Sequence, residues 1–311
     1  MVGLGGNNFG PRLDADDTAK VVHAAIDAGI TFIDTADLYG DGLSEEYLGA
    51  ALAGVRDEVI VATKFGMAKP PETLAGPRLT GGDPAWVRQA VDASLRRLGT
   101  DWIDLYLLHQ PDPAVTLADT LGALHELVAA GKVREIGCSN FDAELAAEAA
   151  AIADEIEATP FRCIQNRYSV LHREPEAEVL PWCEQSGTAF VPFYPLESGL
   201  LTGKVTGAGD PVPGTRLAAM TPERRAGFLS DSRLAAALRL QDYARSRDRT
   251  LLELACAYLL AQPPLASIIA GAMTVEQVAA NAAAVDWRLT PDEVEEIREV
   301  AGSAGGSRTE R

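Results

Sequence analysis

Short apolar runs of strand length alternate with longer segments of helical periodicity along almost the whole chain. Eight runs, most of them without polar alternation, occupy residues 2–5, 30–34, 58–63, 102–108, 133–137, 162–165, 188–192 and 266–270. This pattern is typical of strands that are covered on both faces of a parallel sheet. Segments of helical period lie at residues 16–28, 44–53, 84–98, 117–130, 142–153, 175–185, 234–246, 250–261, 274–284 and 291–300. The repeated order of strand and helix predicts a closed (β/α)8 TIM barrel with eight parallel strands, rather than an open doubly wound sheet.

The domain count follows from this alternation and not from the length. A chain of 311 residues fits either two domains of ordinary size or one α/β barrel. We therefore expect a single barrel domain over residues 1–300 and a flexible C-terminal tail over residues 301–311. The connection at residues 195–233, after the seventh run, is far longer than the others and rich in Gly, Pro and Thr. Loops of that length in a compact domain are usually functional or disordered.

Charge and cysteine content exclude several classes of function. Lys and Arg number 27 against 45 Asp and Glu, and the resulting net charge of −18 repels nucleic acids and anionic membrane surfaces. The four cysteines have neither C-x-x-C pairing nor metal-ligand spacing. The most apolar stretch, residues 251–261, is shorter than the roughly 18 residues of a membrane span, and no leader opens the sequence. We expect a cytoplasmic protein without metal, nucleic-acid partner or membrane association; the oligomeric state stays open.

Polar and aromatic residues stand where six consecutive predicted strands end. Active sites of such barrels lie at the C-terminal ends of the strands. An acid, a lysine and a histidine each end an apolar run, which the ordinary polarity of loops does not readily explain. We expect these side chains to converge on one mouth of the barrel: Asp34, Lys64, His109, Ser139 with Asn140, Gln165 with Asn166, and Phe193 with Tyr194.

A phenol beside these groups would make an acid–base site. Tyr39 follows Asp34 on the next loop. A nearby ammonium stabilises phenolate and lowers a tyrosine pKa from about 10 toward neutral pH. We therefore expect Asp34 to hold Lys64 charged, Lys64 to lower the pKa of Tyr39, and His109 to orient an oxygen beside the phenol. Such a site donates a proton to a developing alkoxide.

Two glycine-rich segments imitate nucleotide-binding motifs without meeting their requirements. Residues 3–8 lack the third glycine and the following helix of a dinucleotide fingerprint. Residues 199–205 are one residue short of a phosphate loop, and valine stands where Ser or Thr must hold magnesium. Neither motif is expected to act as such.

Five segments resemble the aldo/keto reductase family, in the order and with the spacing that the family has. They lie at residues 33–40 (IDTADLYG), 44–49 (SEEYLG), 62–64 (ATK), 107–109 (LLH) and 137–141 (GCSNF). The resemblance covers nearly the whole chain. Residues 193–196 and 199–204, and residues 269–272 with Glu276, Gln277 and Asn281, are similar to a branch that includes bacterial reductases and potassium-channel β subunits.

The resemblance implies an NAD(P)H-dependent oxidoreductase that reduces an aldehyde or ketone to an alcohol by hydride transfer. It implies a catalytic tetrad of Asp34, Tyr39, Lys64 and His109, with Tyr39 as general acid, and a substrate pocket that includes Asn8, Tyr39, Phe65 and His109. The nicotinamide would lie across the barrel mouth, stacked on Phe193, where the family usually has Tyr, and the long connection would cover the pyrophosphate. The cofactor contacts it implies are Gly6, Asn7, Ser139, Asn140, Gln165, Phe193, Tyr194, Pro195, Leu196, Ser198, Gly199, Leu201, Lys204, Arg216, Gly271, Met273, Gln277 and Asn281.

Three departures from the family pattern affect these expectations. The region that resembles the 2′-phosphate site contains Gly271, Ala272, Met273 and Gln277 but no cation, so NADP(H) is the expected cofactor and NAD(H) the alternative. Gly6 replaces a common Thr beneath the nicotinamide. The hairpin that commonly caps the barrel floor would precede the first strand and is not in this sequence, which fits either a shortened sequence or a barrel with an open floor.

Two other functions are compatible with parts of this pattern. One is a nicotinamide-binding regulatory subunit with little turnover. The other is an aldolase that forms a Schiff base on Lys64, which needs a lowered lysine pKa, whereas Asp34 should raise it.

Overall fold

Eight parallel strands form one continuous sheet in the computed structural model, which describes residues 1–67, 81–205 and 216–302. The strands are β1 Val2–Gly5, β2 Phe32–Asp34, β3 Ile60–Phe65, β4 Ile103–Leu108, β5 Val133–Ser139, β6 Cys163–Gln165, β7 Ala189–Phe190 and β8 Ile268–Gly271. Their order in the sheet is β7-β6-β5-β4-β3-β2-β1-β8. Sequential strands are therefore neighbours, except that β8 lies beside β1, at the opposite end of this order from β7.

Backbone hydrogen bonds between the two ends of the sheet close it into a barrel. Phe190 of β7 donates its N–H to Pro264 O at 2.8 Å, just before β8. Ile269 of β8 donates to Pro192 O at 3.1 Å, just after β7. The predicted eight-stranded parallel (β/α)8 barrel is therefore confirmed.

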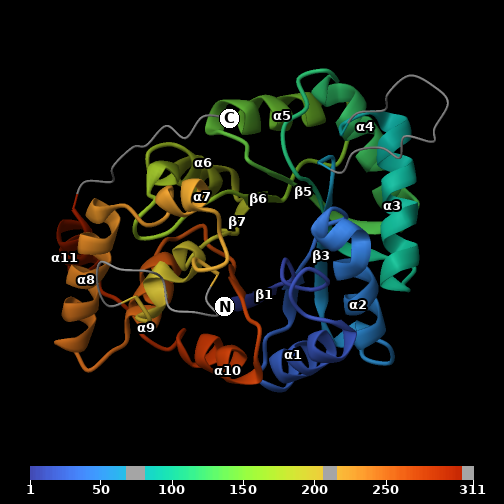
Figure 1. Cartoon of the computed structure of the whole chain (residues 1–311). Helices are drawn as coiled ribbons and strands as arrows, with labels where there is room; N and C mark the ends of the chain where they lie inside the picture. The colour runs from blue at the N-terminus through green and yellow to red at the C-terminus, as the bar shows by residue number, and fades with distance from the viewer. Residues whose placement is uncertain (68–80, 206–215, 303–311) are drawn as a thin grey trace.

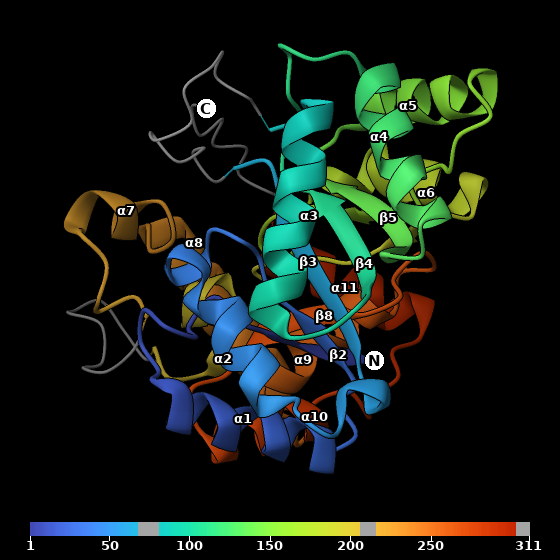
Figure 2. The same cartoon turned by 90° about the vertical axis from the view of Figure 1, so that its right-hand side faces the viewer.

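Helices surround the strands, as the two perpendicular views show (Figures 1 and 2). Consecutive helices from α1 to α6 contact one another, α10 packs on α1, and α11 packs on α8. The helices are α1 Ala15–Asp27, α2 Leu43–Ala51, α3 Pro84–Leu98, α4 Leu117–Ala129, α5 Ala143–Glu155, α6 Val179–Ser186, α7 Pro222–Ala226, α8 Asp231–Arg245, α9 Leu251–Leu260, α10 Val275–Ala283 and α11 Pro291–Ala301.

Local sequence signals explain where several helices begin and end. The carboxylate of Asp83 accepts from Ala85 N at 2.8 Å, Pro84 opens α3, and Gly99 ends it with a φ of 62°. α9 and α11 each begin with a capping box, formed by Thr250 with Glu253 and by Thr290 with Glu293. These caps satisfy backbone groups at the ends of α3, α9 and α11.

The predicted elements differ from the structure mainly in the long connection and at their ends. The helix expected over residues 175–185 is divided into a 3-10 turn at Glu174–Glu176 and α6. Within residues 195–233 the structure contains a 3-10 segment, η4 Glu197–Thr202, and the short helix α7, which the sequence did not indicate. Residues 206–215 of this connection, and residues 303–311 of the predicted tail, lie outside the described residues.

Strand register decides which side chains face the barrel interior. Asp34 pairs with Ala62, and the alternation along β3 then turns Lys64 inward as well. Beneath them an apolar cluster fills the interior: Phe32, Ala62, Leu105, Leu107, Cys163, Val191 and Ile269. The same alternation turns Phe65 outward, where it is fully buried and stacks on Tyr106 with ring centroids 4.6 Å apart. The prediction that Phe65 contacts substrate was therefore wrong.

Close packing of α2 on α3 depends on a glycine. A Cβ added to Gly49 of α2 would lie 2.5 Å from the carbonyl oxygen of Leu98, at the end of α3. Gly122, inside α4, has no heavy atom within 4 Å of the same position. Comparing the two positions therefore distinguishes the effect of helix propensity, which applies to both, from the effect of close packing, which applies only to Gly49.

We expect Gly49→Ala and Gly122→Ala to change the free energy of unfolding in opposite directions. Alanine favours a helix interior over glycine by about 1 kcal/mol, so Gly122→Ala should stabilise the protein by roughly that amount. Gly49→Ala should destabilise it by about 1–3 kcal/mol, because backbone must move to admit the methyl group. Denaturant unfolding of both variants measures the difference, and equal stabilisation by both would contradict the close contact.

Candidate active site

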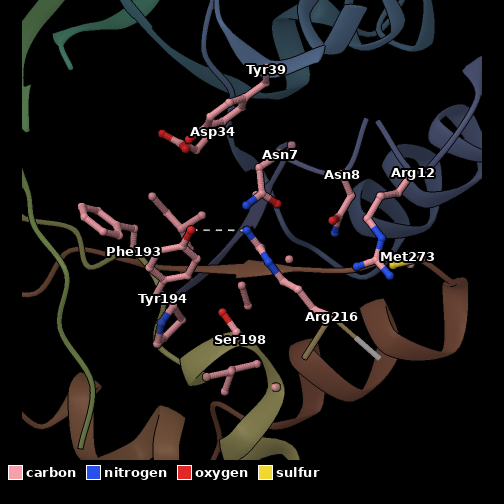
Figure 3. A pocket seen from close by; sticks show the side chains of 18 of the residues that line it. Asn7, Asn8, Arg12, Asp34, Tyr39, Phe193, Tyr194, Ser198, Arg216 and Met273 are labelled. Atoms are coloured by element: carbon pink, nitrogen blue, oxygen red, sulfur yellow. Dashed lines mark hydrogen bonds between the residues drawn. The ribbon is translucent and has the colours of Figure 1, made fainter. Parts of the chain in front are cut away.

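A cavity of about 800 Å³ opens at the C-terminal ends of the strands (Figure 3). Every strand of the barrel contributes a residue at or just beyond its end. These residues are Gly5 and Gly6 after β1, Asp34, Lys64, His109, Ser139, Gln165, Phe193 and Gly271. Tyr39 enters the same cavity from the loop after β2.

A buried ion pair between Asp34 and Lys64 lies at the base of the cavity. Lys64 Nζ donates to Asp34 Oδ1 at 2.5 Å and to Thr35 O at 2.8 Å, and Gln165 Nε2 donates to Asp34 Oδ2 at 2.7 Å. Burial opposes the charge of Lys64, but Asp34 and Tyr39 together outweigh that effect and raise the lysine pKa above its usual value. Lys64 is therefore an ammonium at neutral pH.

Tyr39 is held over this ion pair by a tight turn. Gly40, Asp41 and Gly42 follow it with φ values of 60°, 56° and 96°. Lys64 Nζ lies 5.3 Å from the centroid of the Tyr39 ring. Burial nevertheless raises the pKa of Tyr39 above its usual value, and Lys64 only partly offsets that effect. The expected lowering of this pKa was wrong for the protein without cofactor, and the phenol keeps its proton at neutral pH.

His109 lies against Tyr39 and is uncharged. The two rings meet edge to face, with centroids 6.0 Å apart and an angle of 80°. Burial and then the positive charge of Lys64 lower the pKa of His109 to about 3. A neutral imidazole has one N–H donor and one acceptor nitrogen. The site thus presents a protonated phenol and a neutral imidazole to the same space.

Most of the predicted contact residues line this cavity. Of the residues predicted for the substrate, Asn8, Tyr39 and His109 line it and Phe65 does not. Leu201 is the exception among the predicted cofactor contacts, because its side chain is fully buried in the hydrophobic core. The cofactor candidates that line the cavity are Gly6, Asn7, Ser139, Asn140, Gln165, Phe193, Tyr194, Pro195, Leu196, Ser198, Gly199, Lys204, Arg216, Gly271, Met273, Gln277 and Asn281.

Besides His109 Nδ1, two buried polar atoms of the lining lack hydrogen-bond partners among the described residues. Gln165 Oε1 is one, on the amide whose nitrogen is bound to Asp34. Ser198 Oγ, in η4, is the other. A buried acceptor or hydroxyl without a hydrogen-bond partner lowers the stability of the fold unless a bound ligand supplies that partner. A nicotinamide cofactor fits both, because its carboxamide has N–H donors and its pyrophosphate has acceptor oxygens.

Arg12 and Arg224 also line the cavity, although no motif in the sequence indicated them. Arg12 reaches the cavity from the connection between β1 and α1 (Figure 3), and Arg224 from α7. With Lys64, Lys204 and Arg216 they give the cavity five cations, against Asp34 as the single acidic residue among the described lining. The cavity is therefore positive although the chain carries a net charge of −18.

Several residues at the mouth have left-handed backbone conformations without being glycine. Asn140 has a φ of 62°, Tyr194 of 56°, Glu197 of 47° and Ser198 of 57°. Each such residue costs about 1–2 kcal/mol and persists only where its surroundings hold it. Tyr194 is fixed in part by Arg216, which donates to its hydroxyl at 3.3 Å.

A buried carboxyl pair lies behind the turn that carries Tyr39. Glu45 is fully buried, and it accepts from Thr63 Oγ1 at 2.6 Å and from Arg97 Nε at 2.6 Å. Asp37 is its neighbour, and Asp37 Oδ1 has no hydrogen-bond partner among the described residues. Burial and the charge of Glu45 raise the pKa of Asp37 to about 7.

The described residues contain neither a metal-binding cluster nor a membrane-spanning helix. No group of three His, Cys, Asp or Glu side chains within residues 1–67, 81–205 and 216–302 is arranged to hold a metal ion. In the same part of the chain, no helix has the length and apolar character needed to cross a membrane.

A closed parallel barrel with Asp, Tyr, Lys and His at its mouth defines a class of oxidoreductases, and the sequence comparison agrees. Residues 1–301 match the aldo/keto reductase family. The chain is 33% identical over 301 residues to the aldo-keto reductase yakc [NADP(+)] of Schizosaccharomyces pombe, covering 95% of this chain and 85% of the yeast protein. It is 34% identical over 310 residues to the NADH-specific methylglyoxal reductase of Escherichia coli, covering 96% and 91%. The chain therefore belongs to the aldo/keto reductase family.

Solved structures agree with this assignment. The aldo-keto reductase AKR11C1 from Bacillus halodurans, in its holo form, superposes with a TM-score of 0.78 at 31% identity, over 99% of this chain and 94% of that one. The glycerol dehydrogenase AKR11B4 from Gluconobacter oxydans superposes with a TM-score of 0.81 at 30% identity, over 96% and 90%. Family membership supports nicotinamide-dependent carbonyl reduction.

The raised pKa of Asp37 leads to a test of the carboxyl pair. Between about pH 4 and pH 7 folded Asp37 holds a proton that the unfolded chain has released, so this group lowers stability as pH rises through that window. Asp37→Asn removes the effect, and its stability relative to wild type should rise by roughly 1–3 kcal/mol between about pH 5 and pH 8. Denaturant unfolding at both pH values measures this, with the exposed Asp101→Asn as control. A difference that does not vary with pH would contradict the raised pKa.

Proposed function

We propose that this protein reduces an aldehyde or ketone to an alcohol with NADPH or NADH, using Tyr39 as general acid. The observation that carries the proposal is the combination of protonation states in one cavity. Tyr39 holds its proton, Lys64 is charged beside Asp34, and His109 is neutral. Reduction of a carbonyl requires a proton donor at the oxygen, which this arrangement supplies.

Each member of the tetrad has a distinct role in the proposed reaction. When bound, reduced nicotinamide supplies the hydride that bonds to the carbonyl carbon. Tyr39 donates its proton to the oxygen as negative charge develops there, and the ammonium of Lys64 stabilises the phenolate that remains. Asp34 holds Lys64 in place through the 2.5 Å contact. The neutral His109 donates a hydrogen bond that orients the carbonyl oxygen beside the phenol.

The same cavity has the groups needed to hold the cofactor. Gln165 would accept from the carboxamide, with Ser139 and Asn140 as further hydrogen-bonding partners. Phe193 would offer its aromatic face to the nicotinamide ring. Ser198 and the positive lining would receive the pyrophosphate.

Arg12 supports a preference for NADPH. The connection after β1 lies next to the connection after β8, because Gly5 pairs with Gly271 across the two strands. Arg12 therefore approaches the end of the cavity where Met273 and Gln277 lie, and it forms no ion pair with any described residue. A free guanidinium there fits the 2′-phosphate that distinguishes NADPH from NADH. One relative is named for NADP(+) and another for NADH, so the family alone does not choose between them.

The Schiff-base alternative does not fit Lys64. A nucleophilic amine must be uncharged, and Asp34 raises the pKa of this lysine. The regulatory-subunit alternative differs only in turnover, so cofactor binding without reduction of any carbonyl by the wild-type protein would favour it.

We expect Tyr39→Phe to lower the rate of carbonyl reduction by about 100- to 10,000-fold, because the proton donor is lost. Cofactor affinity should change by no more than about twofold, since the ring remains. The loss of reduced-cofactor absorbance with a panel of carbonyls, methylglyoxal included, measures the rate. Tyr47→Phe, outside the cavity lining, is the matched control. Retained activity in Tyr39→Phe would remove Tyr39 from the role of general acid.

Arg12→Leu should weaken NADPH selectively. Loss of a charge-assisted contact to the 2′-phosphate should raise the Kd for NADPH by roughly 10- to 100-fold and leave the Kd for NADH nearly unchanged. Fluorescence titration with both cofactors measures the two affinities. Arg88→Leu, at an exposed ion pair with Glu126, serves as control. An equal change for NADPH and NADH would show that Arg12 does not read the 2′-phosphate.

A further inference from the structure

The geometry points to Glu197 as a positioning residue for cofactor binding, acting through an ionic latch formed by Arg167, Ser169, Glu197 and Arg233. The inference rests on the proposed function, because the latch holds the segment that would receive the cofactor. Glu197 is not among the residues that line the cavity. It acts through its neighbour Ser198, which does line the cavity.

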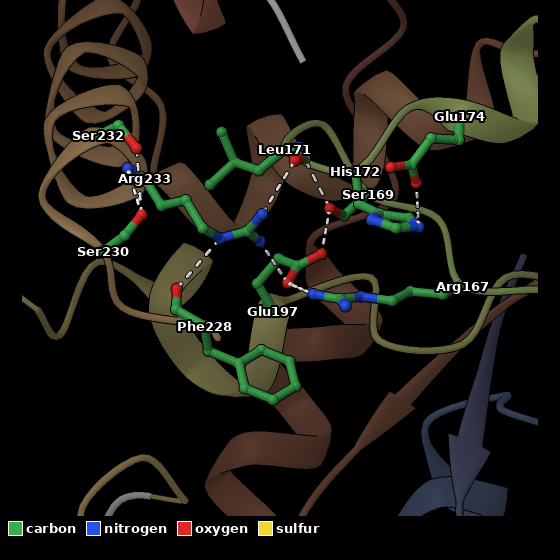
Figure 4. A network of polar contacts seen from close by, with 10 residues as sticks. All are labelled: Arg167, Ser169, Leu171, His172, Glu174, Glu197, Phe228, Ser230, Ser232 and Arg233. Carbon is green, nitrogen blue, oxygen red and sulfur yellow. Dashed lines mark hydrogen bonds and ion pairs between the residues drawn. The ribbon is translucent and has the colours of Figure 1, made fainter. Parts of the chain in front are cut away.

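Both carboxylate oxygens of Glu197 are engaged, although its side chain is fully buried (Figure 4). Oε1 accepts from Ser169 Oγ at 2.5 Å. Oε2 accepts from Arg167 Nη2 at 2.6 Å and forms an ion pair with Arg233 Nη2 at 2.5 Å. Removing one partner from a buried ionic group is strongly unfavourable, so the carboxylate is held firmly in place.

The latch connects three parts of the chain that are distant in sequence. Glu197 opens η4, at the start of the long connection, and Arg233 lies in the first turn of α8, at its end. Arg167 and Ser169 belong to the segment after β6. Arg233 also donates to Phe228 O at 3.1 Å and to Leu171 O at 3.2 Å. Both ends of the connection are thereby fixed to the barrel wall.

An aromatic series continues from the latch to the predicted nicotinamide contact. The guanidinium of Arg167 lies 4.9 Å from the centroid of the Phe228 ring. Phe228 meets Tyr194 edge to face at 5.7 Å, and Tyr194 meets Phe193 edge to face at 5.5 Å. Arg167 also lies opposite Phe193 in a parallel bridge. The latch is therefore connected to two parts of the predicted cofactor site: to Phe193 through this series, and to Ser198, which follows Glu197 in the chain.

Backbone strain at the same point explains why a latch is needed. Glu197 and Ser198 are consecutive non-glycine residues in the left-handed region, with φ values of 47° and 57°. This conformation lets the carboxylate reach Arg167 and Arg233 while Ser198 remains among the residues that line the cavity. Without the ion pairs, the backbone is free to relax toward ordinary φ values, and the hydroxyl of Ser198 loses its position.

The test is the effect of Glu197→Gln on cofactor affinity and on turnover, measured separately. Glutamine keeps the size of the side chain and an acceptor for Ser169 but removes the charge. We expect the Kd for NADPH and for NADH to rise by roughly tenfold or more, while kcat at saturating cofactor changes by less than about threefold. If Glu197 only supports the fold, its substitution should change both the Kd and kcat, or neither of them. Glu126→Gln, at the exposed pair with Arg88, is the matched control.

A second pair of variants applies the same test to the other side of the latch. Arg233→Lys keeps a cation for Glu197 and should retain most of the affinity, whereas Arg233→Met should lose it as Glu197→Gln does. If Glu197→Gln does not fold, the two Arg233 variants test the inference by the same comparison of the change in Kd with the change in kcat. Thermal unfolding of each variant with and without NADPH verifies that folded protein is compared.

Two outcomes overturn the inference, and they differ from failure of the proposed function. Folded Glu197→Gln or Arg233→Met that binds NADPH as tightly as wild type rules out the latch. A loss of kcat at saturating cofactor without a change in Kd also rules it out. If the wild-type protein itself binds neither NADPH nor NADH, the proposed function fails instead.

Discussion

The buried ion pair between Asp34 and Lys64 is the interaction on which the rest of the site depends. Two charges this deep in a barrel are tolerated only because each satisfies the other and the remaining lone pairs are used. The second carboxylate oxygen of Asp34 accepts a hydrogen bond from Gln165, and Lys64 donates a second hydrogen bond to the carbonyl oxygen of Thr35. Burial and then the positive charge of Lys64 lower the pKa of His109 and keep its ring neutral. The ion pair thus joins three strands and contributes to the neutral state of a neighbouring ring.

The barrel and the tetrad could be predicted from sequence because both follow from simple rules. Parallel strands covered on both faces are apolar throughout, and this revealed all eight strands, although β7 is shorter than its run suggests. The polar residues that end the apolar runs indicated Asp34, Lys64 and His109 independently of the family resemblance. The structure brings all three, with Tyr39, into one cavity.

Other features depend on contacts that no short segment of sequence contains. Lys64 and Phe65 are adjacent, and only the register against β2 decides which of them faces the interior. The pKa of Tyr39 depends on how deeply the ring is buried, which outweighs the nearby ammonium. Arg12 lies in a connection without a motif, and Glu197 finds its partners more than 20 residues away in both directions. The sequence therefore predicted which residues gather at the barrel mouth better than which residues hold them in place.

The shortness of β7 has a consequence for how the barrel opens. This strand contributes two residues to the sheet, and its junction with β8 depends on hydrogen bonds that the carbonyl oxygens of the flanking residues Pro192 and Pro264 accept. Local unfolding starts where few backbone hydrogen bonds must break. Amide hydrogen exchange in the barrel should therefore begin at the junction between β7 and β8. The connection with Phe193 and Ser198 begins at this junction. A ligand that spans the connection and the strand ends would therefore slow amide exchange there, and the exchange rate at the junction would report whether the site is occupied.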